Sequence, residues 1–293
     1  MNPARGGAPT TMARLAFSTV ACPDWTITRV LDAAVDHGFE GVEFRSFGYG
    51  GGEFACEPGL TAGAKVRRMF EDRGIECAGL ATGLRYDHEV FPPALGHALP
   101  ADDRSVRDTK PFIDLAVEVG APTVRIFGHD LPERARAGRL AKRRMIDRLR
   151  YAADAAHHTG VLLLLENSGS LPRGADVAEV LDAVDSKDLA ACYSIAPAAN
   201  AGEAPEVGVA ALGRRLAAAR VKDLAGGKPC ALGEGELPVA AFVGALGRSP
   251  AKWLVYEWDR AWVPGLAAAD EALPRAAKFL YGLVNGGARV GSR

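Results

Sequence analysis

Two glutamates in this 293-residue chain each follow a run of apolar residues, which makes them the best candidates for chemistry. The sequence VLLLL precedes Glu166, and WLVY precedes Glu257. Unbroken apolar runs of this length are typical of strands that are covered on both faces. In parallel α/β proteins, reactive side chains gather where such strands end. Two carboxylates that face each other there can remove a proton from a carbon and return one, as general base and general acid.

The rest of the chain supplies the elements that would bring these two glutamates together. Apolar periodicity and glycine stops predict eight strands that alternate with eight helices. Strands are expected at residues 15–18, 41–44, 75–80, 123–127, 161–165, 189–193, 217–222 and 253–256. Helices are expected at residues 26–37, 60–73, 103–119, 140–159, 177–184, 207–215, 239–246 and 266–284.

Eight βα units in a chain of this length favour closure into a single (β/α)8 TIM barrel, an α/β fold. We assign the barrel to residues 14–293 and a disordered leader to residues 1–13. An open, doubly wound sheet is the alternative. The first turn, STVACPDW, lacks the GxGxxG pattern that usually follows the first strand of such a sheet.

Composition narrows the class of protein. The net charge is -1 with basic and acidic residues interleaved, so nothing favours a nucleic-acid partner, which would call for a basic face. No apolar run approaches the roughly 18 residues of a membrane span, and the first dozen residues do not resemble a secretory signal. The five cysteines are scattered and never form CxxC, so we expect buried free thiols. These features predict a cytoplasmic protein with neither a nucleic-acid nor a membrane partner.

Polar residues at the other predicted strand ends complete a candidate site at the barrel mouth. The candidates for substrate binding are Glu43, His129, Asn167, Arg220, Lys222 and Trp258. Each has a structural alternative: His129 could cap a loop, Lys222 could pair with Asp223 at the rim, and Trp258 could simply pack. The segment 86–100 is rich in histidine, proline and acidic residues, and a loop of this length is more often functional than idle.

Several segments of the chain resemble those of a known family. The segments LAFSTVACPDW, GFEGVEFR, LLLLENSG, ARVKDL, ALGEGELP and LVYEWD are similar to those of the xylose-isomerase-like sugar phosphate isomerases and epimerases. The resemblance implies a TIM barrel and a divalent metal, Mn, Mg, Zn or Co, held by four side chains. They are a glutamate after strand five, an aspartate after strand six, a histidine after strand seven and a glutamate after strand eight. Glu166 and Glu257 match the first and last of these positions.

Two of the four positions depart from the family pattern. Ser194 stands at the aspartate position, and Arg220 replaces the histidine in RVKD. An arginine has no lone pair to offer a metal, so the resemblance predicts a degenerate or absent metal site unless Asn200 or His129 supplies a ligand. The Arg220 guanidinium could instead pair with Glu166 or Glu257, or hold a substrate carboxylate or phosphate.

Three classes of function follow from the resemblance and its departures. The first is an enzyme, for which an isomerase or epimerase is favoured over a related lyase such as a keto-inositol-type dehydratase. It would act on a small polyhydroxy carbonyl compound by proton transfer between Glu166 and Glu257. The second is a non-catalytic or metal-independent protein that binds a sugar or sugar acid; a homo-oligomer is compatible with either. The third, a repair endonuclease, needs many histidine and acidic ligands at the strand ends, and His129 is the one histidine predicted there.

Overall fold

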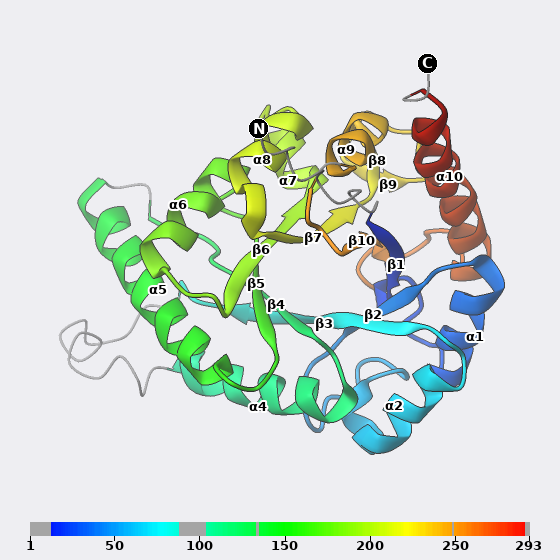
Figure 1. Cartoon of the computed structure of the whole chain (residues 1–293), viewed down its shortest axis with the longest axis horizontal. Helices are drawn as coiled ribbons and strands as arrows, with labels where there is room; N and C mark the ends of the chain where they lie inside the picture. The colour runs from blue at the N-terminus through cyan, green and yellow to red at the C-terminus, as the bar shows by residue number, and fades with distance from the viewer. Residues whose placement is uncertain (1–12, 88–103, 133–134, 248, 291–293) are drawn as a thin grey trace, which may run out of the picture.

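Eight parallel strands close into one barrel, and helices surround it (Figure 1). The computed structural model describes residues 13–87, 104–132, 135–247 and 249–290. Around the ring the order is β1, β10, β7, β6, β5, β4, β3, β2, which confirms the predicted TIM barrel. The strands are β1 (Arg14–Ser18), β2 (Gly41–Arg45), β3 (Glu76–Arg85), β4 (Thr123–Phe127), β5 (Leu162–Glu166), β6 (Leu189–Ser194), β7 (Leu216–Val221) and β10 (Trp253–Tyr256).

The helices lie between successive strands in the chain, as the βα pattern predicts. They are α1 (Ile27–His37), α2 (Gly63–Glu71), α4 (Arg104–Val119), α5 (Ala135–Ala156), α6 (Gly174–Val184), α7 (Ile195–Asn200), α8 (Pro205–Leu212), α9 (Val239–Leu246) and α10 (Ala269–Val290). The bounds of β4, α9 and β10 match the prediction residue for residue. The predicted leader at 1–13 and the segment 86–100 fall almost wholly outside the described residues.

Two local predictions differ from the structure, and two short elements were not predicted. Residues 81–85, expected as a loop, continue β3, because Ala81 pairs with Arg45 of β2 and Arg85 pairs with Phe127 of β4. The predicted helix at 60–73 is divided into a 3-10 turn (Pro58–Leu60) and α2. The short helix α7 and a hairpin formed by β8 (Asp223–Ala225) and β9 (Lys228–Cys230) were not predicted, since each is too short for a periodic pattern.

The barrel interior has an apolar layer beneath a charged layer. Side chains alternate along a strand, so every second residue of a barrel strand points inward. In β5, Leu164 belongs to the buried apolar cluster inside the barrel and Glu166 follows two residues later. In β7, Ala218 belongs to the same cluster and Arg220 follows two residues later. The alternation thus places both charged side chains in the barrel, just above its apolar floor.

The other compositional expectations can be compared with the described residues. All five cysteines are free, and four of them are buried, as expected. In the part of the chain that the structure describes, no helix has both the length and the apolar character needed to span a membrane.

Candidate functional site

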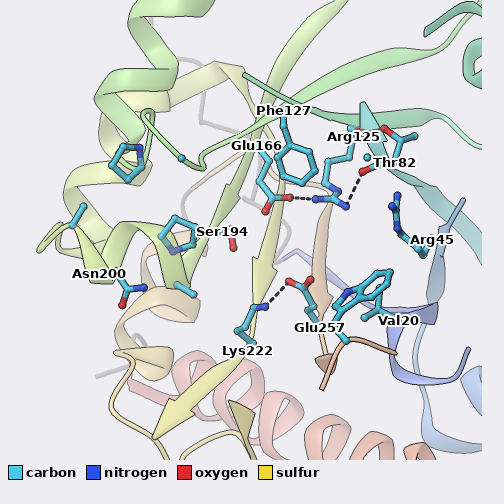
Figure 2. A pocket seen from close by; sticks show the side chains of 17 residues that line it. Val20, Arg45, Thr82, Arg125, Phe127, Glu166, Ser194, Asn200, Lys222 and Glu257 are labelled. Carbon is cyan, nitrogen blue, oxygen red and sulfur yellow. Dashed lines mark hydrogen bonds and ion pairs between the residues drawn. The ribbon is translucent and has the colours of Figure 1, made fainter. Parts of the chain in front are cut away.

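A cavity of about 730 Å³ opens at the carboxyl ends of the barrel strands (Figure 2). This is the end where TIM barrels carry their active sites. Both predicted glutamates line it, together with Arg45 at the end of β2, Arg125 within β4 and Lys222 just after β7. The residues used in the argument below are Arg45, Thr82, Arg125, Glu166, Lys222, Glu257 and Trp262.

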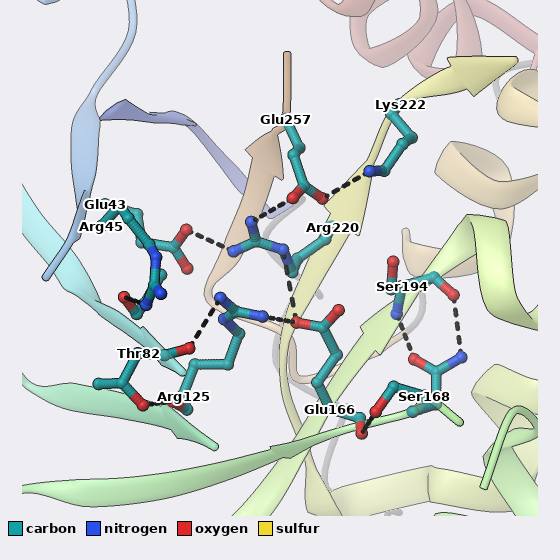
Figure 3. A network of polar contacts seen from close by, with 12 residues as sticks. Glu43, Arg45, Thr82, Arg125, Glu166, Ser168, Ser194, Arg220, Lys222 and Glu257 are labelled. Atoms are coloured by element: carbon teal, nitrogen blue, oxygen red, sulfur yellow. Dashed lines mark hydrogen bonds and ion pairs between the residues drawn. The ribbon is translucent and has the colours of Figure 1, made fainter. Parts of the chain in front are cut away.

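Arg220 lies beneath this cavity at the centre of three carboxylates (Figure 3). Its side chain is 1 % exposed, and it donates a hydrogen bond to Glu43 from β2. Its Nε lies 3.5 Å from Glu166 Oε2, and its Nη2 lies 3.2 Å from Glu257 Oε1. The two glutamates are therefore brought to one guanidinium across the barrel, although β6 and β7 separate β5 from β10 in the ring.

Two further cations hold the outer sides of these glutamates. Arg125 Nη1 donates to Glu166 Oε2 at 2.8 Å, and its Nη2 donates to the Thr82 carbonyl at 3.3 Å. Lys222 Nζ lies 3.3 Å from Glu257 Oε2 and 2.7 Å from Asp259. The result is a buried network of alternating charge, in which each glutamate contacts two cations.

The charges determine which groups stay ionised. Burial by itself would raise the pKa of Glu257, but Arg220 and then Lys222 outweigh it and hold that pKa well below its usual range. Burial would lower the pKa values of Arg220 and Lys222, but the surrounding carboxylates, Glu257 first, raise both. Burial and the charge of Glu257 raise the pKa of Asp259. Glu257 is thus a permanent anion and Lys222 a permanent cation near neutral pH.

The residues at the position of the family metal do not fit a divalent cation. The Arg220 guanidinium occupies the space between the two glutamates that would be ligands, and it contacts both within 3.5 Å. A fixed positive charge with no lone pair repels a metal there and cannot bind it. Ser194 does not compensate, because its neutral hydroxyl does not supply the anionic oxygen of the aspartate that the family has at this position.

His129 does not repair the metal site either. Among the described residues, the group of possible ligands that the structure brings together is Asp87, His129 and Asp130, whose ligand atoms lie within 4.8 Å of one another. Arg85 already occupies this group, with its Nη2 at 2.6 Å from Asp87 and 3.8 Å from Asp130. Neither the Glu166–Glu257 position nor the Asp87, His129 and Asp130 group therefore fits a divalent metal.

Of the six predicted binding residues, Lys222 lines the cavity. Glu43 and Arg220 belong to the buried network, and the other three lie outside the cavity lining. The buried Asn167 is a brace between strand ends, since it donates to the Ser194 and Pro172 carbonyls at 3.0 and 2.8 Å. His129 lies against the ring of Phe127 and beside Asp130. Trp258 is buried, donates to the Ala267 carbonyl at 2.9 Å and lies outside the lining of this cavity. Trp262 lines the cavity instead.

Sequence reasoning also missed residues that the structure places in the site. Arg125 lies in the middle of the strand sequence TVRIF, so a search restricted to strand ends does not find it. A charged residue within a short apolar strand was the available signal, since a buried charge needs a partner. Asp259 and Arg45 were visible near strand ends, but their sequence contexts carry no signal of contact with Lys222 or the cavity.

Comparison with known proteins gives the same class as the fold. The chain matches the family model for the xylose isomerase-like TIM barrel over residues 31–282, so it belongs to that family. No curated protein sequence matches it significantly.

Solved structures extend the comparison in fold alone. An L-ribulose 3-epimerase superposes with a TM-score of 0.77 at 18 % identity, covering 96 % of this chain and 97 % of that one. A D-allulose 3-epimerase from Methylomonas sp. gives 0.70 at 15 % identity, covering 93 % and 98 %. The IOLI protein with a bound zinc atom gives 0.71 at 14 % identity, covering 93 % and 98 %. The probable 3-DHS dehydratase AsbF from Bacillus anthracis gives 0.69 at 14 % identity, covering 92 % and 98 %.

Proposed function

We propose that this protein is an isomerase or epimerase of a small polyhydroxy carbonyl compound that moves a proton beside the carbonyl without a divalent metal. Family membership and the epimerase-like fold support the reaction class. The observation that carries the proposal is the state of Glu166. Arg125 and Arg220 both contact its Oε2, while its Oε1 has no hydrogen bond or ion pair among the described residues (Figure 3). One oxygen is therefore available to accept a proton.

The roles of the two glutamates then differ from the general base and general acid pair that the sequence suggested. Glu166 Oε1 takes the proton from the carbon next to the carbonyl group of the substrate. Glu257 has both oxygens committed, Oε1 to Arg220 and Oε2 to Lys222, and its lowered pKa keeps it ionised. It serves to orient Lys222 toward the cavity.

The cations replace the electrophile that a metal supplies elsewhere. As the proton leaves, its bonding electrons move toward the carbonyl oxygen, which becomes an enolate. Lys222 and Arg125 line the cavity and present fixed positive charge to that oxygen. Return of the proton from Glu166 to the former carbonyl carbon, while the hydroxyl proton of the first carbon passes to the enolate oxygen, gives isomerisation. Return of a solvent proton to the first carbon on its opposite face, with Glu166 releasing its own proton to solvent, gives epimerisation.

Hydrogen exchange at carbon tests this proposal directly. Aldoses, ketoses, their phosphates and sugar acids are incubated with the protein in D2O containing EDTA, and proton NMR follows each carbon-bound hydrogen. At least one compound should exchange, and E166Q should slow that exchange by about 10²- to 10⁴-fold without unfolding the protein. The control E76Q, at the start of β3 and the opposite end of the barrel, should exchange normally. Exchange that survives in E166Q, or that EDTA abolishes, contradicts the proposal.

A second candidate is a protein that binds a sugar or sugar acid without turning it over. Arg220 favours it, because a guanidinium at the metal position neutralises both glutamates at once. A compound that raises the melting temperature but never exchanges its hydrogens would support this alternative. A keto-inositol-type dehydratase shares the proton abstraction, and the same NMR spectra would reveal it through loss of a β-hydroxyl group.

A further inference from the structure

Arg45 is a cation of the cavity wall whose charge has no partner in the described structure. It ends β2 and lines the cavity, as Arg125 and Lys222 do. Those two cations are each paired with carboxylates of the network. No described carboxylate lies within ion-pair distance of Arg45.

The bonds that Arg45 does make hold it in place and leave one edge free. Its Nη1 donates to the Ala81 carbonyl at 2.9 Å and to the Ser46 carbonyl at 3.2 Å. Its guanidinium stacks on Phe47, with the carbon 4.5 Å from the ring centroid, and lies 5.8 Å from the centroid of Trp262. The Nε and Nη2 atoms have no hydrogen-bond partner among the described residues. This free edge is the one that matches two oxygens of a carboxylate or phosphate.

The surroundings keep that edge open and favour an anion. A Cβ at Gly83 would lie only 3.1 Å from Arg45 Nη2, so glycine leaves room beside the guanidinium. Burial and the nearby Arg125 lower the pKa of Arg45 to about 10, which an incoming anion would reverse. In Figure 2 Arg45 lies on the side of the cavity opposite Asn200 and Ser194, with Glu166 and Glu257 between.

We infer that Arg45 binds a carboxylate or phosphate group of the substrate, so that the ligand is an anionic polyhydroxy compound rather than a neutral sugar. The inference rests on the proposed function for the position of the reacting carbon near Glu166. The anionic group would be held at Arg45, at a distance from Glu166 and its free oxygen. Fixing one end of a flexible ligand in this way also orients the carbon that reacts.

Equilibrium binding of unreactive polyols separates this inference from the catalytic proposal. D-glucitol, D-gluconate and D-glucitol 6-phosphate share a six-carbon hydroxylated chain but have no carbonyl group, so none can undergo the proposed reaction. In the native protein, calorimetry should show one or both anions binding about 10- to 100-fold more tightly than D-glucitol. The tighter anion identifies the group as a carboxylate or a phosphate.

Variants at position 45 decide whether Arg45 is responsible. R45M should reduce the preference for the anion to about one, and R45K should keep only part of it because an ammonium cannot bind two oxygens side by side. The control is R29M, since Arg29 also stacks on a tryptophan, at 4.2 Å, but pairs with Asp270 instead of lining the cavity. An equal preference in R45M and native protein, no preference in the native protein, or no binding of either anion up to about 10 mM would each overturn the inference.

Discussion

Removing Arg220 should show how much of the fold depends on the cation at the centre of the network. Glu166 would still have Arg125 and Glu257 would still have Lys222. Glu43 would lose the one cation that contacts it in the described structure, and its side chain is only 8 % exposed. Leaving a buried charge without its partner typically costs about 3–5 kcal/mol. We therefore expect R220M, which keeps much of the side-chain length, to lower the free energy of unfolding by about that amount.

A double-mutant cycle separates the ionic contact from the loss of packing. E43Q alone should cost about 1–2 kcal/mol, because Arg220 keeps two carboxylates and the amide oxygen can still accept a hydrogen bond. In E43Q/R220M the unpaired charge at position 43 is gone, so the double variant should be more stable than the two single costs predict, by about 1–3 kcal/mol. Urea unfolding at pH 8 measures all four proteins, and thermal unfolding should show R220M melting roughly 10 °C lower.

Two measurements could refute this reasoning. The cost of R220M should shrink between pH 8 and pH 5, because an unpaired buried carboxylate can take up a proton. The control R29M removes an ion pair whose side chains are 54 % and 61 % exposed, so it should cost less than about 1 kcal/mol. If R220M were as stable as the control, or if the cycle were additive, Glu43 would not depend on Arg220.

Two further predictions concern the stability effects of substitutions at Glu257 and Gly208. E257Q should weaken the dependence of the unfolding free energy on pH in the acid range. The lowered pKa of Glu257 stabilises the fold at pH values above the ordinary glutamate pKa of about 4.3. This stabilisation is lost as the pH falls toward the lowered pKa. The slope below about pH 4.5 should therefore drop by up to about 1.4 kcal/mol per pH unit, and equal slopes in urea titrations would contradict this. G208A in α8 should cost about 1–3 kcal/mol, because its Cβ would collide with the Tyr193 hydroxyl and the Glu203 carboxylate. G244A in α9 is the matched control, since its Cβ meets nothing within 4 Å and alanine favours a helix by about 0.5–1 kcal/mol. A G208A variant as stable as G244A would show that α8 is not packed against Tyr193 and Glu203 as described.

The sequence alone determined the features that depend on local patterns. Apolar runs and glycine stops indicated every barrel strand, because burial on both faces requires a continuous apolar segment. The same runs located Glu166 and Glu257, since a strand that ends in a carboxylate marks the barrel mouth. The sequence also showed that Arg220 stands where the family has a histidine, and that an arginine cannot serve as a metal ligand there.

Only the tertiary structure decided which of these side chains meet. Whether a strand-end residue faces the cavity depends on the register of eight strands, and a shift of one residue reverses every side chain. In the closed barrel Asn167 is hydrogen-bonded between strand ends and Trp258 lies outside the cavity, whereas Arg125 contacts Glu166. It also left Arg45 without a described carboxylate, because pairing of charges from distant strands is a property of the closed ring and of no single segment.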